Sequence, residues 1–190
     1  MSPLANTVTY LLSLGTLVAN FGLAILIILI FLDKRANKKG KSLHVYYDHL
    51  KRNALLLGLV SIIVATIGSL FYSEIANLPP CSLCWIQRIL MFPQIVIIGF
   101  ALYYESHRAV RLSAILSVLG IMFAGYHAYL QYGFGEGHLL CNLFGGISCS
   151  QRYFLEFGYI TMPIMSLTIF VLLLLLTTFV HIPKDKLPKI

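Results

Sequence analysis

The hydrophobic residues of this chain gather in five long stretches that are separated by polar connections. The stretches cover residues 8–32, 54–71, 81–104, 112–132 and 157–180. An α-helix rises about 1.5 Å per residue, so roughly 18 or more apolar residues are enough to cross a hydrocarbon core about 30 Å thick. The pattern therefore predicts an all-α integral membrane protein with five transmembrane helices.

Four of the five stretches contain no charged residue, and the third contains Arg88. An arginine at the centre of a bilayer costs roughly 2.5–3.5 kcal/mol even on the most lenient insertion scale. A charge at that position needs a reason, and Arg88 is therefore a candidate functional residue.

The composition agrees with a membrane protein. Hydrophobic residues make up 58% of the chain and charged residues 11%, whereas soluble domains are about 25% charged. The polar connections are too short to bury a core of their own, so we expect no separate soluble domain. No basic residue precedes the first stretch and no small-residue cleavage site follows it, which favours a retained helix over a signal peptide.

The formal charge of +7 is distributed very unevenly along the chain. Twelve of the 14 basic residues lie in connections that fall on one side of the predicted membrane: Lys34, Arg35, Lys38, Lys39, Lys41, Lys51, Arg52, Arg108, Arg111, Lys184, Lys186 and Lys189. The positive-inside rule then places the N-terminus outside and the C-terminus in the cytoplasm. A patch that binds anionic lipid would need the same orientation. We expect no nucleic-acid partner, because the basic residues follow the membrane topology.

All four cysteines fall on the extracytoplasmic side of this topology. Cys81 and Cys84 begin the third stretch, and Cys141 and Cys149 lie between the fourth and the fifth. Two cysteine pairs on the oxidising face of a membrane are typical of thiol-disulfide chemistry. The orientation was obtained from lysines and arginines alone, so this agreement is independent.

The first pair forms a Cys-x-x-Cys motif directly after Pro79 and Pro80. Proline is tolerated just before a helix, where no backbone donor is needed, so we expect the helix to begin near Cys81. Cys81, Cys84 and Arg88 then share one helical face. The free amides of a helix start and a nearby guanidinium both favour a thiolate, the species that attacks disulfides.

The second pair lies in a segment rich in glycine, which argues against a regular helix and predicts a loop. Two other interpretations of the four cysteines stay open at this point. They could bind zinc, although the eight-residue step from Cys141 to Cys149 is wide for a ligand pair. They could also form two structural disulfides, although a bridge from Cys81 to Cys84 would close too small a loop to add much stability.

Three segments resemble the DsbB/BdbC family of disulfide-bond formation proteins, and the BdbC branch more closely. They are GSLFYSEI at 68–75, PCSLCWIQRILM at 80–91 and FGYITMP at 157–163. The resemblance covers roughly residues 52–181 and implies a four-helix membrane bundle. The chain would then consist of an extra N-terminal helix with a basic connection (1–51), the bundle (52–181) and a short basic tail (182–190).

The resemblance also implies a function and roles for named residues. The loop pair Cys141 and Cys149 would be attacked by an extracytoplasmic thioredoxin-like thiol oxidase of the DsbA/BdbD type. The pair Cys81 and Cys84 would reoxidise them, with Cys84 and Arg88 beside a membrane quinone, either ubiquinone or menaquinone. The expected location is a bacterial-type cytoplasmic membrane.

Two further residues are candidates for binding the quinone. His127 lies near the outer end of the fourth stretch and could donate a hydrogen bond to a quinone carbonyl, although a histidine among interfacial tyrosines is also typical of an aromatic belt. Gln87 is a similar candidate. In the extra helix, Gly15 and Gly22 share a face and would permit a close helix contact, or that face could simply meet lipid.

Two other function classes remain open on the sequence alone. A quinone reductase similar to vitamin K epoxide reductase would also use two cysteine pairs in a helical bundle. The order of the Cys-x-x-Cys in the chain favours the DsbB type. A membrane scaffold would make the cysteines incidental.

Overall fold

The computed structural model describes residues 3–35, 41–133, 141 and 148–179, and the side chains of 29–35 and 41–52 lie outside the description. Its elements are α1 (Pro3–Arg35), α2 (Lys41–Leu70), a π-helical turn η1 (Phe71–Ile75), α3 (Ser82–Met91), α4 (Pro93–Tyr104), α5 (His107–Gln131) and α7 (Met162–Phe179). Within these residues there is no strand, and a single bridge joins Glu156 to Ile160.

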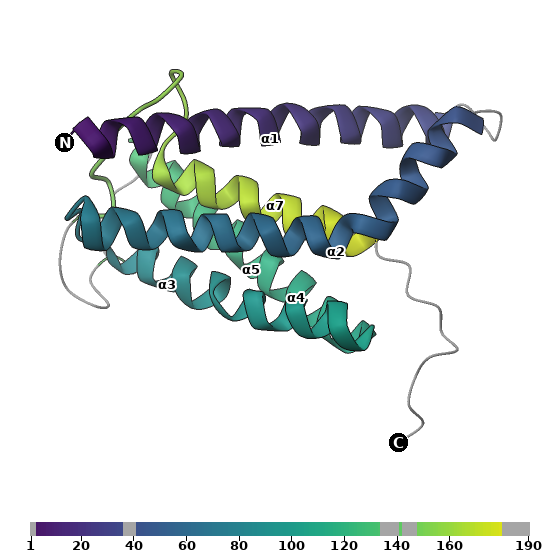
Figure 1. Ribbon diagram of the computed structural model, residues 1–190. Coiled ribbons are helices and arrows are strands. Elements are labelled where there is room, and N and C mark those ends of the chain that lie inside the picture. Colours follow the sequence, from purple (N-terminus) through teal and green to yellow (C-terminus); the bar gives the residue numbers. More distant parts are fainter. Residues whose placement is uncertain (1–2, 36–40, 134–140, 142–147, 180–190) are drawn as a thin grey trace.

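The helices run side by side and alternate in direction, so that one end of the bundle collects the start of α1, the end of α2, the starts of α3 and α7, and the end of α5 (Figure 1). Four helices are long and apolar enough to cross a membrane, namely Pro3–Ile28, Asn53–Ile75, Ser82–Tyr104 and His107–Gln131, and Met162–Thr178 is a shorter apolar helix. The predicted all-α membrane fold with five helices is confirmed.

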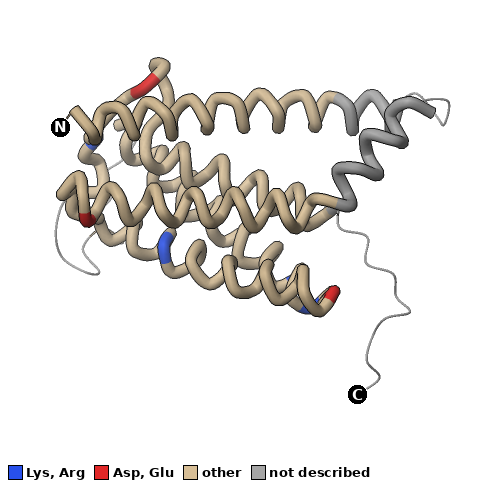
Figure 2. Tube along the Cα trace, in the orientation of Figure 1, with Lys and Arg blue, Asp and Glu red and all other residues tan. Residues whose placement is uncertain are grey.

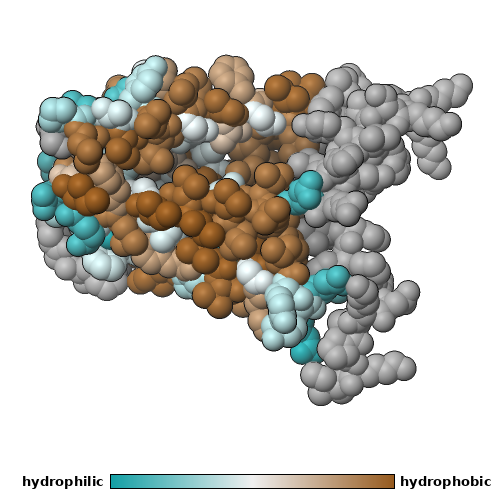
Figure 3. Space-filling view, viewed as in Figure 1, coloured by the Kyte–Doolittle hydropathy of each residue, from teal (hydrophilic) through white to brown (hydrophobic). Residues whose placement is uncertain are grey.

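The surface of the bundle matches a membrane setting. In the described part, charged residues lie mainly towards the two ends, and one basic segment interrupts the uncharged middle on α3 (Figure 2). The space-filling view shows a broad hydrophobic band between a more polar end and the undescribed end (Figure 3). The side chains of Val18 and Phe21 on α1 are more than half exposed, as expected for contact with lipid.

Several helix boundaries differ from the sequence-based prediction, and the largest difference is at α2, which begins at Lys41 rather than at residue 54. The third helix is divided at Phe92, because Pro93 lacks an N–H and begins α4 as a new helix on nearly the same course. The second continues into the π-helical turn before Asn77 adopts a positive φ of 52°. The fifth begins at Met162 rather than at residue 157, because Phe157 and its neighbour Gly158 both have positive φ.

The centre of the bundle is formed where α5 packs against α7, the most extensive helix contact in the described residues. Gly120 of α5 lies directly against the ring of Phe170, which is completely buried. A side chain at position 120 would overlap that ring, so the close approach requires glycine. Ile62, Met91, Ile98, Ala124 and Leu173 complete this buried cluster.

Candidate active site

Cys81 is the N-cap of α3. Its backbone is extended, with φ −75° and ψ 170°, and its Sγ accepts a hydrogen bond of 3.3 Å from the backbone N–H of Cys84. A helix start presents unpaired amides and the positive end of the helix dipole, both of which stabilise negative charge. The helix start that the two prolines predict is therefore also an electrostatic site for a thiolate.

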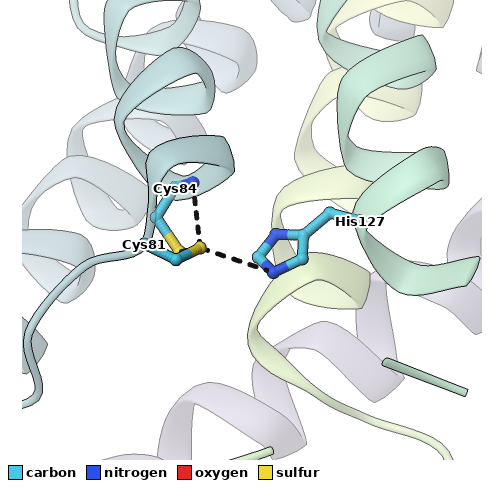
Figure 4. Close-up of side chains that lie close together, drawn as sticks. All are labelled: Cys81, Cys84 and His127. Atoms are coloured by element: carbon cyan, nitrogen blue, oxygen red, sulfur yellow. Dashed lines mark hydrogen bonds between the residues drawn. The ribbon is translucent and has the colours of Figure 1, made fainter. Parts of the chain in front are cut away.

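The two sulfurs of this pair lie together, and a histidine from another helix joins them (Figure 4). The Sγ atoms of Cys81 and Cys84 are 2.8 Å apart, and Nε2 of His127 on α5 lies 3.6 Å from Cys81 Sγ. Nδ1 of His127 forms a 2.9 Å hydrogen bond with Nε2 of Gln87. Cys81, Cys84, Gln87 and His127 thus meet at the end of the bundle where α3 begins and α5 ends.

The environment of Cys81 lowers the pKa of its thiol from 9.0 to about 4. The largest cause is the hydrogen bond from the Cys84 thiol. The hydrogen bond and electrostatic interaction with His127 and the hydrogen bond from the Cys84 backbone N–H act in the same direction, while burial of the sulfur opposes them. In the reduced pair, Cys81 therefore carries a thiolate at neutral pH.

Arg88 lies one turn further along α3 and is only 8% exposed. Its Nε donates to Ser69 Oγ at 2.9 Å, and an Nη atom donates to the Ser69 carbonyl oxygen at 2.7 Å. Its guanidinium also lies 5.5 Å from the centre of the Trp85 ring, which is within cation–π range. These contacts give the buried guanidinium hydrogen-bond partners and hold it in a fixed position.

The second pair, Cys141 and Cys149, forms a disulfide. Cys149 is 1% exposed, whereas Cys141 is partly exposed. Ser82 Oγ donates a 2.8 Å hydrogen bond to the Cys141 carbonyl oxygen, which ties this pair to the start of α3. The neighbouring residues 134–140 and 142–147, where the sequence predicts a loop, lie outside the described residues.

Both pairs belong to one buried cluster. Cys81 and Cys149 pack there with Leu83 and Leu130. A small cavity between the pairs is lined by Cys81, Cys84 and Cys149, and its wall includes the polar side chains of His127 and Gln131. The fold therefore brings together two cysteine pairs that are far apart in the sequence.

A larger cavity of about 380 Å³ is also lined by Cys84. Its polar end is lined by Cys84, Gln87, Arg88 and His127, and its remaining wall consists mainly of apolar residues of α1, α2 and α7. A volume of roughly 300–1,000 Å³ with a few convergent polar groups is typical of a site for a small organic molecule. Only Cys84 of the four cysteines faces this cavity.

The same group of side chains bears on the zinc interpretation. The ligand atoms of Cys81, Cys84 and His127 all lie within 4.8 Å of one another. The four-cysteine zinc site considered from the sequence is not formed, because Cys141 and Cys149 are bonded to each other.

Comparison with known proteins identifies the family of this chain. Residues 51–180 match the family described as disulfide bond formation protein DsbB. The chain belongs to this family. A probable disulfide formation protein of Oceanobacillus iheyensis is 39% identical over 130 residues, which cover 65% of this chain and 88% of the relative. Disulfide bond formation protein C of Bacillus subtilis is 34% identical over 60% of this chain and 81% of its own length.

A probable disulfide formation protein of Coxiella burnetii is 35% identical, with 62% of this chain and 80% of the relative covered. No solved structure gives a significant match. The predicted resemblance is thus confirmed, and the chain is a thiol oxidoreductase of the disulfide-forming DsbB family.

Some residues of the site were not found from the sequence. Ser69 lies in one of the family segments, but nothing in its surroundings marks it as the acceptor for Arg88. Tyr153 lines both cavities, and its hydroxyl donates a 3.2 Å hydrogen bond to the Pro79 carbonyl oxygen. The contribution of α1 to the large cavity was also missed, although polar residues recur along this helix and could have indicated a buried face.

The pKa of Cys81 gives a testable prediction. Because this pKa is lowered to about 4, alkylation of Cys81 in the reduced Cys141→Ser/Cys149→Ser protein should be nearly constant from pH 8 to pH 6 and should fall only as the pH approaches 4. Cys84→Ala removes the strongest stabilising contact, so its alkylation profile should move to higher pH. The measurement is the rate of modification by iodoacetamide, followed by mass spectrometry of the peptide that contains Cys81. A midpoint near pH 9 in the Cys141→Ser/Cys149→Ser protein that keeps Cys84 would contradict the assigned thiolate.

Proposed function

We propose that this protein reoxidises an extracytoplasmic thioredoxin-like thiol oxidase of the DsbA/BdbD type and passes the electrons to a membrane quinone, either ubiquinone or menaquinone. The order of the four sulfurs supports this proposal. Cys141 is partly exposed, Cys149 and Cys81 share the small cavity, and Cys84 faces the large cavity. The sulfurs therefore lead from the protein surface to an apolar site within the membrane bundle.

In the proposed exchange, a thiolate of the partner attacks Cys141 Sγ and releases Cys149 as a thiolate. Cys149 then attacks Cys81 of an oxidised Cys81–Cys84 pair and releases Cys84. The partner's second thiolate displaces Cys141, which in turn displaces Cys81 from Cys149. In balance, the partner gains a disulfide, the Cys141–Cys149 bond is restored, and the Cys81–Cys84 dithiol holds the two electrons.

The low pKa of Cys81 favours this direction of exchange. A disulfide is a stronger oxidant when its reduced form is stabilised, as in thiol oxidases with a low-pKa cysteine. The cap position and His127 stabilise the Cys81 thiolate. Electrons should therefore move from the outer pair to this pair.

The residues of the large cavity fit a quinone. When bound, a quinone would accept two electrons from the reduced pair, with one proton from the Cys84 thiol and a second from water. Ser69 takes up two of the five N–H donors of Arg88, and Arg88 lies on the cavity wall. We propose that it also donates to a quinone oxygen, where its fixed charge stabilises the negative charge that develops. Gln87 and His127 are proposed as further contacts to the ring.

The family match favours this function over the reductase similar to vitamin K epoxide reductase and over a scaffold. We propose a bacterial-type cytoplasmic membrane as its location, with the cysteines on the extracytoplasmic face. The basic clusters support that orientation. Most of their side chains lie outside the described residues.

The orientation can be tested with topology reporters. A reporter fused after Lys41 or Lys186 should be cytoplasmic, and one inserted near Gly137 should be extracytoplasmic, because basic connections are retained inside. Paired alkaline phosphatase and green fluorescent protein fusions give opposite signals on the two sides. A cytoplasmic signal at Gly137 would place the cysteines in the reducing compartment and refute the proposal.

The unequal exposure of the loop pair predicts different outcomes for its two variants. With an oxidised thioredoxin-like thiol oxidase, Cys149→Ala should accumulate a mixed disulfide through Cys141, because the thiol that would release it is missing. Cys141→Ala should form little mixed disulfide, since Cys149 is buried. Non-reducing gel electrophoresis measures both products. Equal trapping by the two variants would show that Cys141 is not the preferred point of attack.

The proposed role of Arg88 in quinone reduction can be tested with substitutions that leave the fold intact. Arg88→Ala should slow quinone-dependent reoxidation of the Cys81–Cys84 dithiol at least tenfold, and Arg88→Lys should be intermediate because it keeps the charge but loses the planar donor group. The measurement is the loss of free thiol after addition of quinone in one lipid and detergent mixture, with thermal unfolding as the control. An unchanged rate in Arg88→Ala would leave Arg88 as a structural anchor only.

A further inference from the structure

The helix α1 lies outside the family match, which begins at residue 51, and yet it forms part of the large cavity. Leu11, Leu12, Gly15, Thr16 and Ala19 of α1 line it together with residues of α2, α3 and α7. In Figure 1, α1 extends along the side of the bundle next to α7. Without α1, this part of the cavity would have no protein wall.

Hydrogen bonds hold α1 in place on both sides of the cavity. Near its start, the hydroxyl of Tyr72 donates to Thr9 Oγ1 at 3.2 Å. Further along, Thr168 Oγ1 donates to Asn20 Oδ1 at 2.9 Å, and Asn20 Nδ2 donates to the hydroxyl of Tyr159 at 3.3 Å. These hydrogen bonds to α2, to α7 and to Tyr159 fix the orientation of the helix against the bundle.

The face of α1 that meets the bundle is distinct from its lipid-facing side. Thr9 and Ser13 are 1% and 0% exposed. Leu12 packs closely on Gly68 of α2, where an added Cβ would come within 3.1 Å of Leu12 Cδ1. By contrast, an added Cβ at Gly15 would meet nothing within 4 Å. The helix is therefore in close contact near position 12 and leaves open space beside position 15.

The cavity has one polar end and a long apolar wall, as expected for a site that binds an amphiphilic molecule. Its end at Cys84 and Arg88 is polar, and Ile169 and Leu172 of α7 belong to its apolar wall. The α1 residues that line it lie between the attachment points at Thr9 and Asn20, which are about 16 Å apart along the helix axis at 1.5 Å per residue. A ring at the polar end would place a hydrocarbon chain against this wall.

We propose that α1 forms a binding wall for the isoprenoid chain of the quinone, with Thr16 and Ala19 in contact with that chain. The wall holds a long-chain quinone at the redox pair and adds affinity that a quinone without a chain does not gain. This inference rests on the proposed quinone function. It gives the first helix a part in ligand binding that the sequence does not indicate.

The test compares two alanines of the same helix. Ala19 lines the cavity, whereas Ala24 is exposed and does not, so Ala19→Leu and Ala24→Leu add the same side chain in two settings. Binding is measured by quenching of Trp85, the one tryptophan of the chain, on titration with a long-chain polyprenyl quinone and with a ring analogue that lacks the chain. We expect Ala19→Leu to weaken binding of the long-chain quinone at least fivefold and of the ring analogue less than twofold. Ala24→Leu should change neither affinity by more than twofold.

Equal weakening of both ligands by Ala19→Leu, or no weakening of either, would overturn the role of α1 in binding the chain. The wild-type protein would still bind quinone in both cases, so the proposed function would stand. If the wild-type protein binds and reduces neither quinone, the proposed function fails together with this inference.

A second experiment needs no variant and is independent of the stability of Ala19→Leu. A long-chain quinone with a photoreactive group on its first isoprene unit is irradiated in the wild-type protein, and the labelled peptides are identified by mass spectrometry. Label on the segment 11–19 that is displaced by excess unlabelled quinone supports the proposal. Displaceable label confined to α2 and α7 would overturn it.

Discussion

The structure depends on the placement of two sulfurs across the start of one helix. Because Cys81 caps α3 and Cys84 lies in its first turn, the pair is held between two different surroundings. Cys81 faces the small cavity shared with Cys149, and Cys84 also faces the large apolar cavity. The two prolines before the motif set the start of α3 at this point, and the free amides of that helix start stabilise negative charge on Cys81. Residues of the other helices form the remaining walls of the two cavities.

The buried arginine is a second consequence of the same helix start. Arg88 lies in the second turn of α3, and its contacts to Ser69 offset part of the cost of burying a charge. Those contacts also connect α3 to α2, immediately before the π-helical turn. The positive charge near Cys81 and Cys84 is thus held by the packing of α3 against α2.

The sequence predicts the parts of this structure that depend on local chemistry. Hydrophobic length predicts five helices, prolines predict the start of α3, and spacing places Cys84 and Arg88 on one face. It does not predict contacts that arise only when helices assemble, such as His127 with Cys81 or Ser69 with Arg88. Gly15 and Gly22 illustrate the limit, because added Cβ atoms at both positions meet nothing within 4 Å. The helix instead docks through Thr9 and Asn20, whose role depends on partners more than 60 residues away.

The unequal exposure of the cysteines has a consequence for how the centre keeps its oxidising power. A small thiol that reached an exposed disulfide would reduce it by thiol-disulfide exchange. Here Cys149 and Cys81 are buried, and within the Cys141–Cys149 disulfide Cys141 is the partly exposed sulfur. A thiol must approach Cys141 in line with the Cys141–Cys149 bond. Thiols that cannot reach that position are therefore excluded. Burial of the other sulfurs therefore protects the cysteine pairs from reduction by small thiols that approach from other directions.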